Sequence, residues 1–431
     1  MSLLYDLSFI IFSVLYLPYF LIKRKWRDFS PQRIGIYPKA TLLRLKDRNP
    51  IWIHAVSVGE VMATVPLYEE IKRSYPSEMI VVSTVTSTGF SVAATKFGND
   101  AVIIYLPLDL SFIVNRVVKI INPKAIFIAE TEVWPNLINS LKRYGTKIVL
   151  FNGRISKGSF KRYRLITPIL RRILDRIDLF LMRSQADAEK IITLGAPKDR
   201  VRITGNLKYD AAFLKREGHR LNPVELRERF GLSEKEQLLI AGSTHNREEE
   251  VILRCYRKLT NDYPLLRLLV APRHIERSKD IVNLAKAQGL NSFLISQLED
   301  IGSRLKQNEI LILDVMGMLS EVYSIGEIIF IGGSLVKKGG QNPLEAAYYS
   351  KTIIFGPHTF NFQDITDQFL SNGGAILVKD EEELLDSIKR LLNSADERKV
   401  LGERAKAIVQ SNIGIAKKDL ELIEALNIFK R

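Results

Sequence analysis

The stretch from Pro50 to Leu67 is PIWIHAVSVGEVMATVPL, and it decides how the chain begins to fold. Ile51-Trp52-Ile53 is a short apolar run typical of a buried strand, and a helical pattern opens after Glu60. A strand therefore leads into a turn of small residues, and that turn places a carboxylate at a helix start. Ligands of parallel α/β sheets bind at this edge, against helix N-termini.

Glu60 has two interpretations at this position. The first is a general base, because its carboxylate lies at the edge of the sheet where ligands bind. The second is structural, with Glu60 only complementing the helix dipole in the first turn. The spacing alone favours the structural interpretation, because short motifs often occur without the function they suggest.

Strand-like and helical segments alternate through most of the chain, which predicts doubly wound parallel sheets. The chain has 431 residues, too many for one ordinary domain, so we expect two. The further strand-like runs of the first half are residues 80–83, 101–105, 125–129, 147–150 and 179–182. Those of the second half are residues 238–241, 266–270, 310–313, 328–331 and 352–355.

The predicted organisation has four parts. Residues 1–30 form an apolar segment with a basic flank, and residues 31–210 form the first domain. Residues 211–236 are polar and lack a strand signal, so we expect them to link the two domains. Residues 237–431 form the second domain, and the last helix packs either within it or back on the first domain.

The N-terminal segment from Leu3 to Ile22 is strongly apolar, interrupted by Asp6 and Pro18. About 20 apolar residues are just enough to span a bilayer. The basic cluster at residues 23–27 predicts that the rest of the chain stays on the cytoplasmic side. A span and a helix lying in the membrane interface both remain open.

The charge balance indicates an anionic partner. The net charge is +15, from 63 Lys and Arg against 48 Asp and Glu. Residues 154–176 hold many basic side chains interleaved with apolar ones, which predicts a basic amphipathic helix that contacts anionic lipids. A solvated surface is the alternative. We find no nucleic-acid-binding motif, so we expect no nucleic acid partner.

Polar residues follow several predicted strands of the first half. Glu130-Thr131-Glu132 follows the strand at residues 125–129 and suits the binding of a polar substrate, with a solvated turn as an equal alternative. Lys208 belongs to TGNLKYD at the end of the first half, so we expect it near the cleft between the domains.

The second half ends its strands in turns typical of a nucleotide site. Glycines ahead of a helix start let the backbone approach a phosphate, and Asn342-Pro343 predicts a helix cap followed by a proline. The histidines at these turns lack the short spacing of metal ligands, so we expect no metal. The turns are GSTH (242–245), PRHIER (272–277), DVMGML (314–319), GGS (332–334) and GPHTFNF (356–362).

Together these segments resemble the Kdo transferases, which transfer 3-deoxy-D-manno-octulosonic acid in bacterial lipopolysaccharide assembly. The resemblance implies a GT-B type α/β fold: two Rossmann-like domains facing a cleft, with the acceptor on the first and the nucleotide sugar on the second. The shared motifs span residues 54–362 and are HAVSVGE, STVTSTGF, ETEVWPN, NGRIS, ITGNLKYD, GSTH, PRHIER, GGSLV, GGQNPLEAA and GPHTFNF.

The resemblance also implies an activity and a location. The activity is inverting transfer of Kdo from CMP-Kdo to the lipid A precursor, lipid IVA, with no metal and no cofactor. The location is the cytoplasmic face of the inner membrane, held by a single N-terminal anchor and in contact with anionic lipids.

Individual residues acquire roles from the same resemblance. Glu60 is similar to the general base that deprotonates the acceptor hydroxyl, and Glu130 and Lys208 are similar to groups that stabilise the transition state. The helix dipole would lower the pKa of Glu60, whereas an apolar wall or the Glu130 carboxylate would raise it. The implied CMP contacts are Pro272, Arg273, Met316, Gly317, Met318, Asn342, Pro343, Leu344 and Glu345.

One departure from the family concerns Met318, where the family usually has an acidic residue. If backbone amides make the donor contact there, the change is tolerated. If a side chain makes it, donor affinity is weakened.

Two other functional classes compete with this interpretation. Another GT-B transferase or a nucleotide-sugar epimerase has the same twin halves, and a uridine rather than a cytidine donor would distinguish it. A non-catalytic membrane module would bind anionic lipid through residues 154–176, and replacement of Glu60 would then have no effect.

Overall fold

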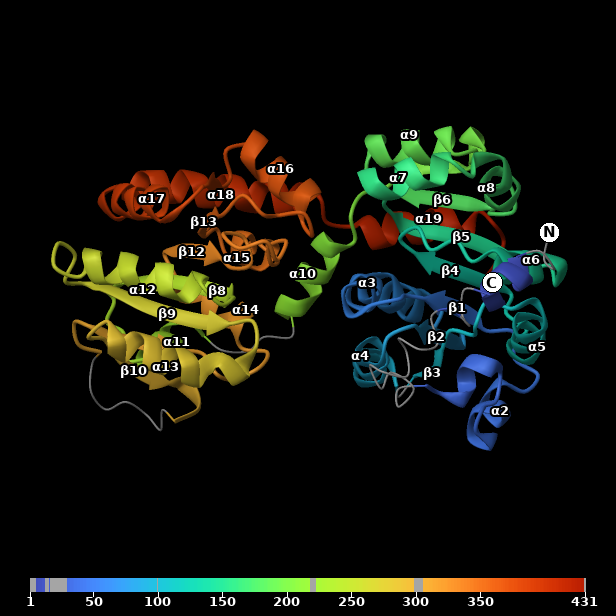
Figure 1. Cartoon of the computed structure of the whole chain (residues 1–431), viewed down its shortest axis with the longest axis horizontal. Coiled ribbons are helices and arrows are strands. Elements are labelled where there is room, and N and C mark those ends of the chain that lie inside the picture. The colour runs from blue at the N-terminus through green and yellow to red at the C-terminus, as the bar shows by residue number, and fades with distance from the viewer. Residues whose placement is uncertain are drawn as a thin grey trace. The chain divides into compact units, whose positions relative to one another are not determined.

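The computed structural model describes residues 5–11, 15, 29–98, 100–217, 222–297 and 305–429. The chain divides into two compact units, the first comprising Met1–Ala211 with Gly414–Arg431 and the second comprising Ala212–Ile413. Each unit contains one parallel sheet with helices on both faces (Figure 1). This confirms the predicted α/β class with two parallel sheets.

The sheet of the first unit has seven strands in the order β3-β2-β1-β4-β5-β6-β7. The order reverses between β1 and β4, so the carboxyl ends of these two strands form the switch point where such sheets bind ligands. The strands are β1 (Ile51–His54), β2 (Ile80–Thr84), β3 (Ala101–Tyr105), β4 (Ala125–Ala129), β5 (Lys147–Gly153), β6 (Leu179–Met182) and β7 (Val201–Ile203).

Helices of the first unit flank this sheet. They are α2 (Lys39–Leu45), α3 (Val58–Ser74), α4 (Ser87–Phe97), α5 (Ser111–Ile121), α6 (Pro135–Arg143), α7 (Lys157–Arg164), α8 (Thr167–Leu174), α9 (Gln185–Thr193) and α19 (Ile415–Glu424). Helix α10 (Lys208–Glu217) carries the chain from the first unit into the second.

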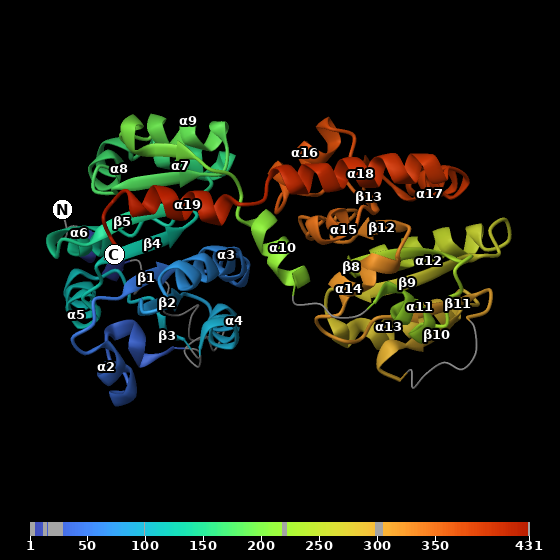
Figure 2. The same ribbon diagram turned by 180° about the vertical axis from the view of Figure 1, so that it is seen from behind.

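Both faces of the first sheet are buried, which is why its strands are nearly continuous apolar runs. Side chains alternate along a strand, so Trp52 of β1 belongs to one hydrophobic core and Ile51 and Ile53 to the other. Helices α5, α6, α8 and α9 complete the Trp52 core, whereas α3, α4 and α19 complete the opposite one (Figure 2).

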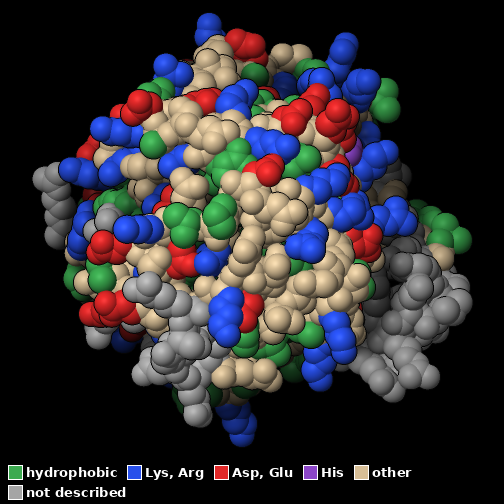
Figure 3. Space-filling model, turned by 90° about the vertical axis from the view of Figure 1, so that its left-hand side faces the viewer, with side chains coloured by type: hydrophobic (Ala, Val, Ile, Leu, Met, Phe, Trp, Pro, Cys, Tyr) green, Lys and Arg blue, Asp and Glu red, His purple; other side chains and the backbone are tan. Residues whose placement is uncertain are grey.

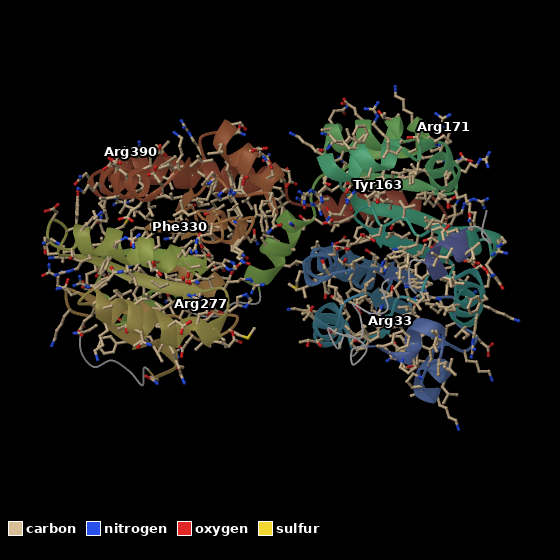
Figure 4. The ribbon with its side chains drawn as sticks, in the orientation of Figure 1. Arg33, Tyr163, Arg171, Arg277, Phe330 and Arg390 are labelled. Atoms are coloured by element: carbon tan, nitrogen blue, oxygen red, sulfur yellow. The ribbon has the colours of Figure 1, made fainter. Side chains whose placement is uncertain are left out.

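The second unit repeats this architecture with the strand order β10-β11-β9-β8-β12-β13-β14. Here the order reverses between β8 and β12. The strands are β8 (Gln237–Thr244), β9 (Leu266–Pro272), β10 (Asn291–Leu294), β11 (Glu309–Ile312), β12 (Ile328–Ile331), β13 (Thr352–Phe355) and β14 (Ile376–Leu377). Phe330 of β12, labelled in Figure 4, is fully buried.

Helices cover this second sheet too. They are α11 (Pro223–Arg229), α12 (Glu248–Leu259), α13 (Ser278–Ala287), α14 (Leu319–Val322), α15 (Leu344–Tyr348), α16 (Gln363–Ser371), α17 (Glu381–Asn393) and α18 (Ala395–Ser411). Short 3-10 helices complete the two units: η2 (Pro31–Ile34), η3 (Lys198–Arg200), η4 (Ile275–Arg277), η5 (Ile295–Gln297) and η6 (Tyr323–Ile325).

Two segments differ from their sequence-based descriptions. The predicted linker at residues 211–236 contains the rest of α10 and all of α11, and its Leu226 and Phe230 are buried in the second unit. The prediction of a single basic helix at residues 154–176 is wrong, because the chain forms α7 and α8, and the backbone leaves the helical conformation between them at Ile166. Pro168 explains the break, since a proline is tolerated in the first turn of a helix but not in its interior.

Most of the predicted N-terminal anchor, including residues 12–14 and 16–28, lies outside the described residues. Among the helices that the structure describes, none is both long and apolar enough to cross a membrane.

The C-terminal helix α19 is joined to the first unit by Asp210. The Asp210 carboxylate accepts hydrogen bonds from the backbone N–H groups of Gly414 (2.7 Å) and Ala416 (2.6 Å). Gly414 precedes the helix and has no side chain to cap it, so Asp210 caps α19 from a distant part of the sequence. Buried Leu420 and Ile423 then fill the core beside α3.

A buried carboxylate shapes the switch point of the second sheet. Glu248, at the start of α12, accepts hydrogen bonds from the backbone N–H groups of His245 (2.9 Å), Gly333 (2.7 Å), Ser334 (2.9 Å) and Leu335 (2.9 Å). Its side chain therefore joins the turn after β8 to the turn after β12. Burial raises the pKa of Glu248, and these backbone hydrogen bonds oppose the rise.

We expect Glu248→Gln to destabilise the second unit by about 2 kcal/mol, because its amide NH₂ would face two backbone N–H donors. Hydrogen exchange of the buried amides in β8 and β12 would then quicken by roughly 30-fold. Glu250→Gln, two residues further along α12, is the matched control and should leave these rates unchanged. Equal exchange in wild type and Glu248→Gln would contradict the structural role of this carboxylate.

Candidate functional site

Glu60 lies in the first turn of α3, directly after β1. Its Oε2 accepts a 2.8 Å hydrogen bond from the Val56 backbone N–H, and its Oε1 accepts a 2.9 Å hydrogen bond from the Ser57 hydroxyl. Glu60 thus closes its own turn, a structural role beyond the dipole interaction considered from the sequence. An ionised carboxylate has about four acceptor positions, so these two bonds leave capacity for a substrate hydroxyl.

The pKa of the Glu60 carboxyl is raised to about 7. Burial is the largest cause, and the neighbouring carboxylates of Glu130 and Glu132 add to it, while the hydrogen bonds from Val56 and Ser57 oppose it. Of the two raising influences considered from the sequence, the Glu130 carboxylate does contribute, and burial is the larger cause. A carboxylate that titrates near neutral pH has the basicity that general-base catalysis requires.

Glu130 follows β4, the strand that pairs with β1, and its backbone is left-handed with a φ of 57°. This conformation is uncommon outside glycine and often occurs at functional sites. Glu130 Oε1 accepts a 2.5 Å hydrogen bond from Arg183 Nη2. The Arg183 side chain is 1% exposed and that of Glu130 is 28% exposed, so the pair is sheltered on the arginine side and open on the other.

Asn152, at the end of β5, connects this ion pair to the region of Lys208. Arg183 Nε donates to the Asn152 backbone oxygen and to Oδ1, both at 3.0 Å. The same Oδ1 accepts a 3.1 Å hydrogen bond from the Leu207 N–H. A continuous chain of hydrogen bonds therefore runs from the Glu130 carboxylate to the residue before Lys208, which begins α10.

The structure thus brings the three predicted catalytic residues to one edge of the first sheet. Glu60 and Glu130 follow adjacent strands, and the Glu130 charge contributes to the raised pKa of Glu60. Lys208 is half-buried and is reached through the Asn152 connection. Such an edge offers a carboxylate for proton transfer and charged groups that can respond to charge developing in a substrate.

The predicted donor residues lie at the carboxyl edge of the second sheet. Pro272 is buried at the end of β9, and exposed Arg273 follows it, with the Arg273 N–H donating to the Thr244 oxygen at 2.9 Å. Asn342 Oδ1 accepts a 3.1 Å hydrogen bond from the Leu344 N–H, so Asn342 binds the first amide of α15 as predicted, although Pro343 precedes the helix instead of occupying its first position. Pro343 has helical backbone angles at the start of α15.

At the carboxyl edge of the second sheet, glycine allows backbone segments of neighbouring turns to approach each other closely. A Cβ on Gly332 would lie 2.4 Å from the Ser243 backbone oxygen, so only glycine fits between the turns after β8 and β12. The turn after β11 is more open: Met316 is 79% exposed, Gly317 has a φ of 87°, and Met318 is half-buried. Glu345, in the first turn of α15, is also half-buried.

The comparison with known proteins decides between the competing families. The family model described as 3-deoxy-D-manno-octulosonic-acid transferase (kdotransferase) matches residues 29–211. The chain is 34% identical over 401 residues to the 3-deoxy-D-manno-octulosonic acid transferase of Haemophilus influenzae, covering 93% of this chain and 92% of that protein. This chain belongs to the Kdo transferase family.

Other members of the Kdo transferase family match over similar lengths. The enzyme of the same description from Rickettsia felis is 33% identical and covers 87% of this chain and 79% of its own. That of Chlamydophila psittaci is 31% identical and covers 92% and 90%. The resemblance drawn from the sequence motifs is therefore confirmed along most of the chain.

Solved structures of more distant proteins share the fold. A putative UDP-N-acetylglucosamine 2-epimerase from Listeria monocytogenes matches with a TM-score of 0.61 at 12% identity, covering 89% of this chain and 98% of that one. A glycosyltransferase from Rickettsia africae matches with a TM-score of 0.58 at 14% identity, covering 89% and 100%. These similarities confirm a GT-B-like pair of Rossmann-type units.

Arg183 is the site residue that the sequence analysis missed. A signal was available, because Arg183 directly follows the apolar strand at residues 179–182 as other polar residues follow theirs. Its partner Glu130 lies 53 positions earlier in the chain, and only the order of the strands brings the two together.

The raised pKa of Glu60 generates a pH prediction for a Kdo transferase of this kind. A general base must be ionised, so we expect kcat/KM to fall about tenfold per pH unit below pH 7 and to level off above it. Glu60→Gln should be nearly inactive and its residual rate should lose this dependence. A flat wild-type profile between pH 5.5 and 8 would contradict the role of Glu60 as the base.

Proposed function

We propose that this protein transfers Kdo from CMP-Kdo to the lipid A precursor with inversion at the anomeric carbon. Membership in the Kdo transferase family sets the reaction class. The observation that supports the mechanism is the Glu60 carboxylate with its pKa of about 7, located at the switch point of the first sheet beside Glu130.

The chemistry of Kdo explains which groups are required. Its anomeric carbon bears a carboxylate and no hydrogen, and CMP leaves it through an oxocarbenium-like transition state. Glu60 removes the proton of the acceptor hydroxyl as the new bond forms. The leaving phosphate gains negative charge, which cationic or backbone N–H groups stabilise. In this proposal no metal is needed.

Glu130 and Lys208 serve the transition state in this proposal. The open side of Glu130 faces away from Arg183, so its carboxylate can interact with positive charge that develops on the sugar. Lys208 supplies a cation to the leaving group or to the Kdo carboxylate. The hydrogen bonds through Asn152 fix the position of the Glu130–Arg183 pair relative to the start of α10, where Lys208 lies.

The second unit binds the CMP-Kdo donor in this proposal. Pro272 and Arg273 end β9, the Gly317 turn follows β11, and Asn342 to Glu345 begin α15, so all emerge from one sheet edge. Met318 replaces the usual acidic residue of the family. Gly317 has a positive φ, and turns of this kind can direct successive backbone amides at an anion, which favours a backbone contact with the donor here.

One assay tests the proposal directly. Purified protein is mixed with CMP-Kdo and tetra-acylated lipid A precursor, and we expect products heavier by the mass of Kdo. Glu60→Gln should lower the rate by at least about 100-fold while CMP still binds. Turnover of a UDP-sugar in place of CMP-Kdo, or an unchanged rate in Glu60→Gln, would overturn the proposal.

We also propose that the protein works on the cytoplasmic face of the inner membrane, with the N-terminal segment as its anchor and anionic lipids as a second contact. Leu165, Ile166 and Ile169 are 84%, 46% and 52% exposed at the junction of α7 and α8. Exposed basic side chains surround them, including Lys161 and the Arg171 labelled in Figure 4. On the face shown in Figure 3, by contrast, basic and acidic side chains are mixed.

A charge-reversal experiment tests the lipid contact. We expect Lys161→Glu with Arg171→Glu to weaken binding to phosphatidylglycerol vesicles by roughly tenfold or more at low salt, since each basic residue near the surface contributes about 1 kcal/mol. High salt should reduce the difference. Lys279→Glu with Lys286→Glu on α13 is the control of equal charge. Equal binding by both variants in a sedimentation assay would contradict the contact.

A further inference from the structure

The helical residues 5–11 turn a carboxylate towards the protein and expose aliphatic side chains. Tyr5, Asp6 and Phe9 are half-buried against the protein, whereas Leu7, Ile10 and Ile11 are 56%, 44% and 52% exposed. A helix on a water-soluble protein normally buries its apolar face and exposes its polar one. Here the Asp6 carboxylate faces the protein and the three aliphatic side chains face outward, which is the arrangement expected beside lipid.

Asp6 makes two hydrogen bonds to helix starts at the carboxyl edge of the first sheet. Its Oδ1 accepts from the Ser111 backbone N–H at 3.0 Å and from Asn136 Nδ2 at 2.7 Å. The residue before α5 is Leu110, whose side chain cannot cap, so Asp6 caps α5 from a position 105 residues away. The same oxygen reaches α6 through Asn136.

Asp109 completes this junction. Its carboxylate accepts from the backbone N–H groups of Asn136 (3.1 Å) and Leu137 (2.8 Å), and thereby caps α6, which has no cap of its own. The Tyr5 hydroxyl also hydrogen-bonds to Asp109. Tyr5 and Asp6 thus attach one short helix to the starts of both α5 and α6.

The junction lies next to the residues assigned to catalysis. Helix α6 begins at Pro135, and the loop before it holds Glu130 and Glu132, both of which influence the charge of Glu60. A shift in the first turn of α6 would move the end of this loop. Phe112, beside Ser111 on α5, is a further apolar side chain with high exposure, at 66%.

The geometry points to Asp6 as a positioning residue that attaches residues 5–11 to the Glu130–Glu132 loop, so that contact of their outward apolar face with the bilayer is coupled to the geometry of the acceptor site. This inference rests on the proposed function. It goes beyond it because the N-terminal segment becomes a part of the acceptor site, whereas a tether would only raise the local concentration of the enzyme.

The test compares Asp6→Ala with Asp6→Asn in the full chain. We expect Asp6→Ala to lower kcat by about tenfold on acceptor dispersed in detergent, with CMP affinity unchanged. Asp6→Asn retains an oxygen that can accept both hydrogen bonds, so it should keep most of the rate. Asp380→Ala, which removes a cap with two backbone hydrogen bonds from α17 in the second unit, should leave kcat unchanged.

A second readout does not depend on catalysis. Hydrogen exchange at the Ser111 amide, and at the first amides of α6, should be roughly tenfold faster in Asp6→Ala than in wild type, because the cap of α5 and the Asn136 contact are lost. This result would support the junction even if the wild-type protein transferred a different sugar.

Two results would overturn the inference. The first is a normal kcat for Asp6→Ala on dispersed acceptor with a raised KM only on vesicles, which would make the segment a tether. The second is unchanged hydrogen exchange at Ser111 and α6. Failure of wild type to transfer Kdo would instead overturn the proposed function, so the two failures are distinguishable.

Discussion

The buried guanidinium of Arg183 is the group on which the polar edge of the first unit depends. A buried charge is costly unless it is paired and hydrogen-bonded, and removing one partner of such a pair typically costs 3–5 kcal/mol. Arg183 Nη2 is paired with the Glu130 carboxylate, and Arg183 Nε donates to two oxygens of Asn152. Three strand ends are therefore fixed relative to each other by one side chain, and the left-handed backbones of Glu130 and Asn152 are held in place by it.

In the second unit, a buried side chain of the opposite charge also connects the turns at the carboxyl edge of the sheet. At its switch point the buried carboxylate of Glu248 gathers four backbone N–H groups from two turns. At each sheet, a buried ionisable side chain thus helps to fix the turns at the carboxyl edge. This leaves other residues free for chemistry: Glu60 in the first unit, and Arg273 with the Gly317 turn in the second.

The strands, helices and caps that depend only on neighbouring residues could be predicted from the sequence. The strand before Glu60, the helix after it and the cap at Asn342 were all predictable from short segments. The Arg183–Glu130 pair, the Asp6 junction and the Asp210 cap join residues 53, 105 or more, and 204 or more positions apart. No periodicity encodes such contacts, since they arise only when the order of the strands is set. The break between α7 and α8 is different, because Pro168 indicated it locally.

The return of α19 to the first unit has a consequence for biosynthesis. Ile415, Leu420 and Ile423 are buried in the core of the first unit, yet they are translated after the whole of the second unit. At 5–20 residues per second the ribosome takes roughly 10 to 40 s to make the intervening residues. During that time the nascent first unit exposes the apolar groove that α19 will fill, while the second unit can already close its own core. This delay leaves apolar surface of the first unit open to aggregation until α19 has been made.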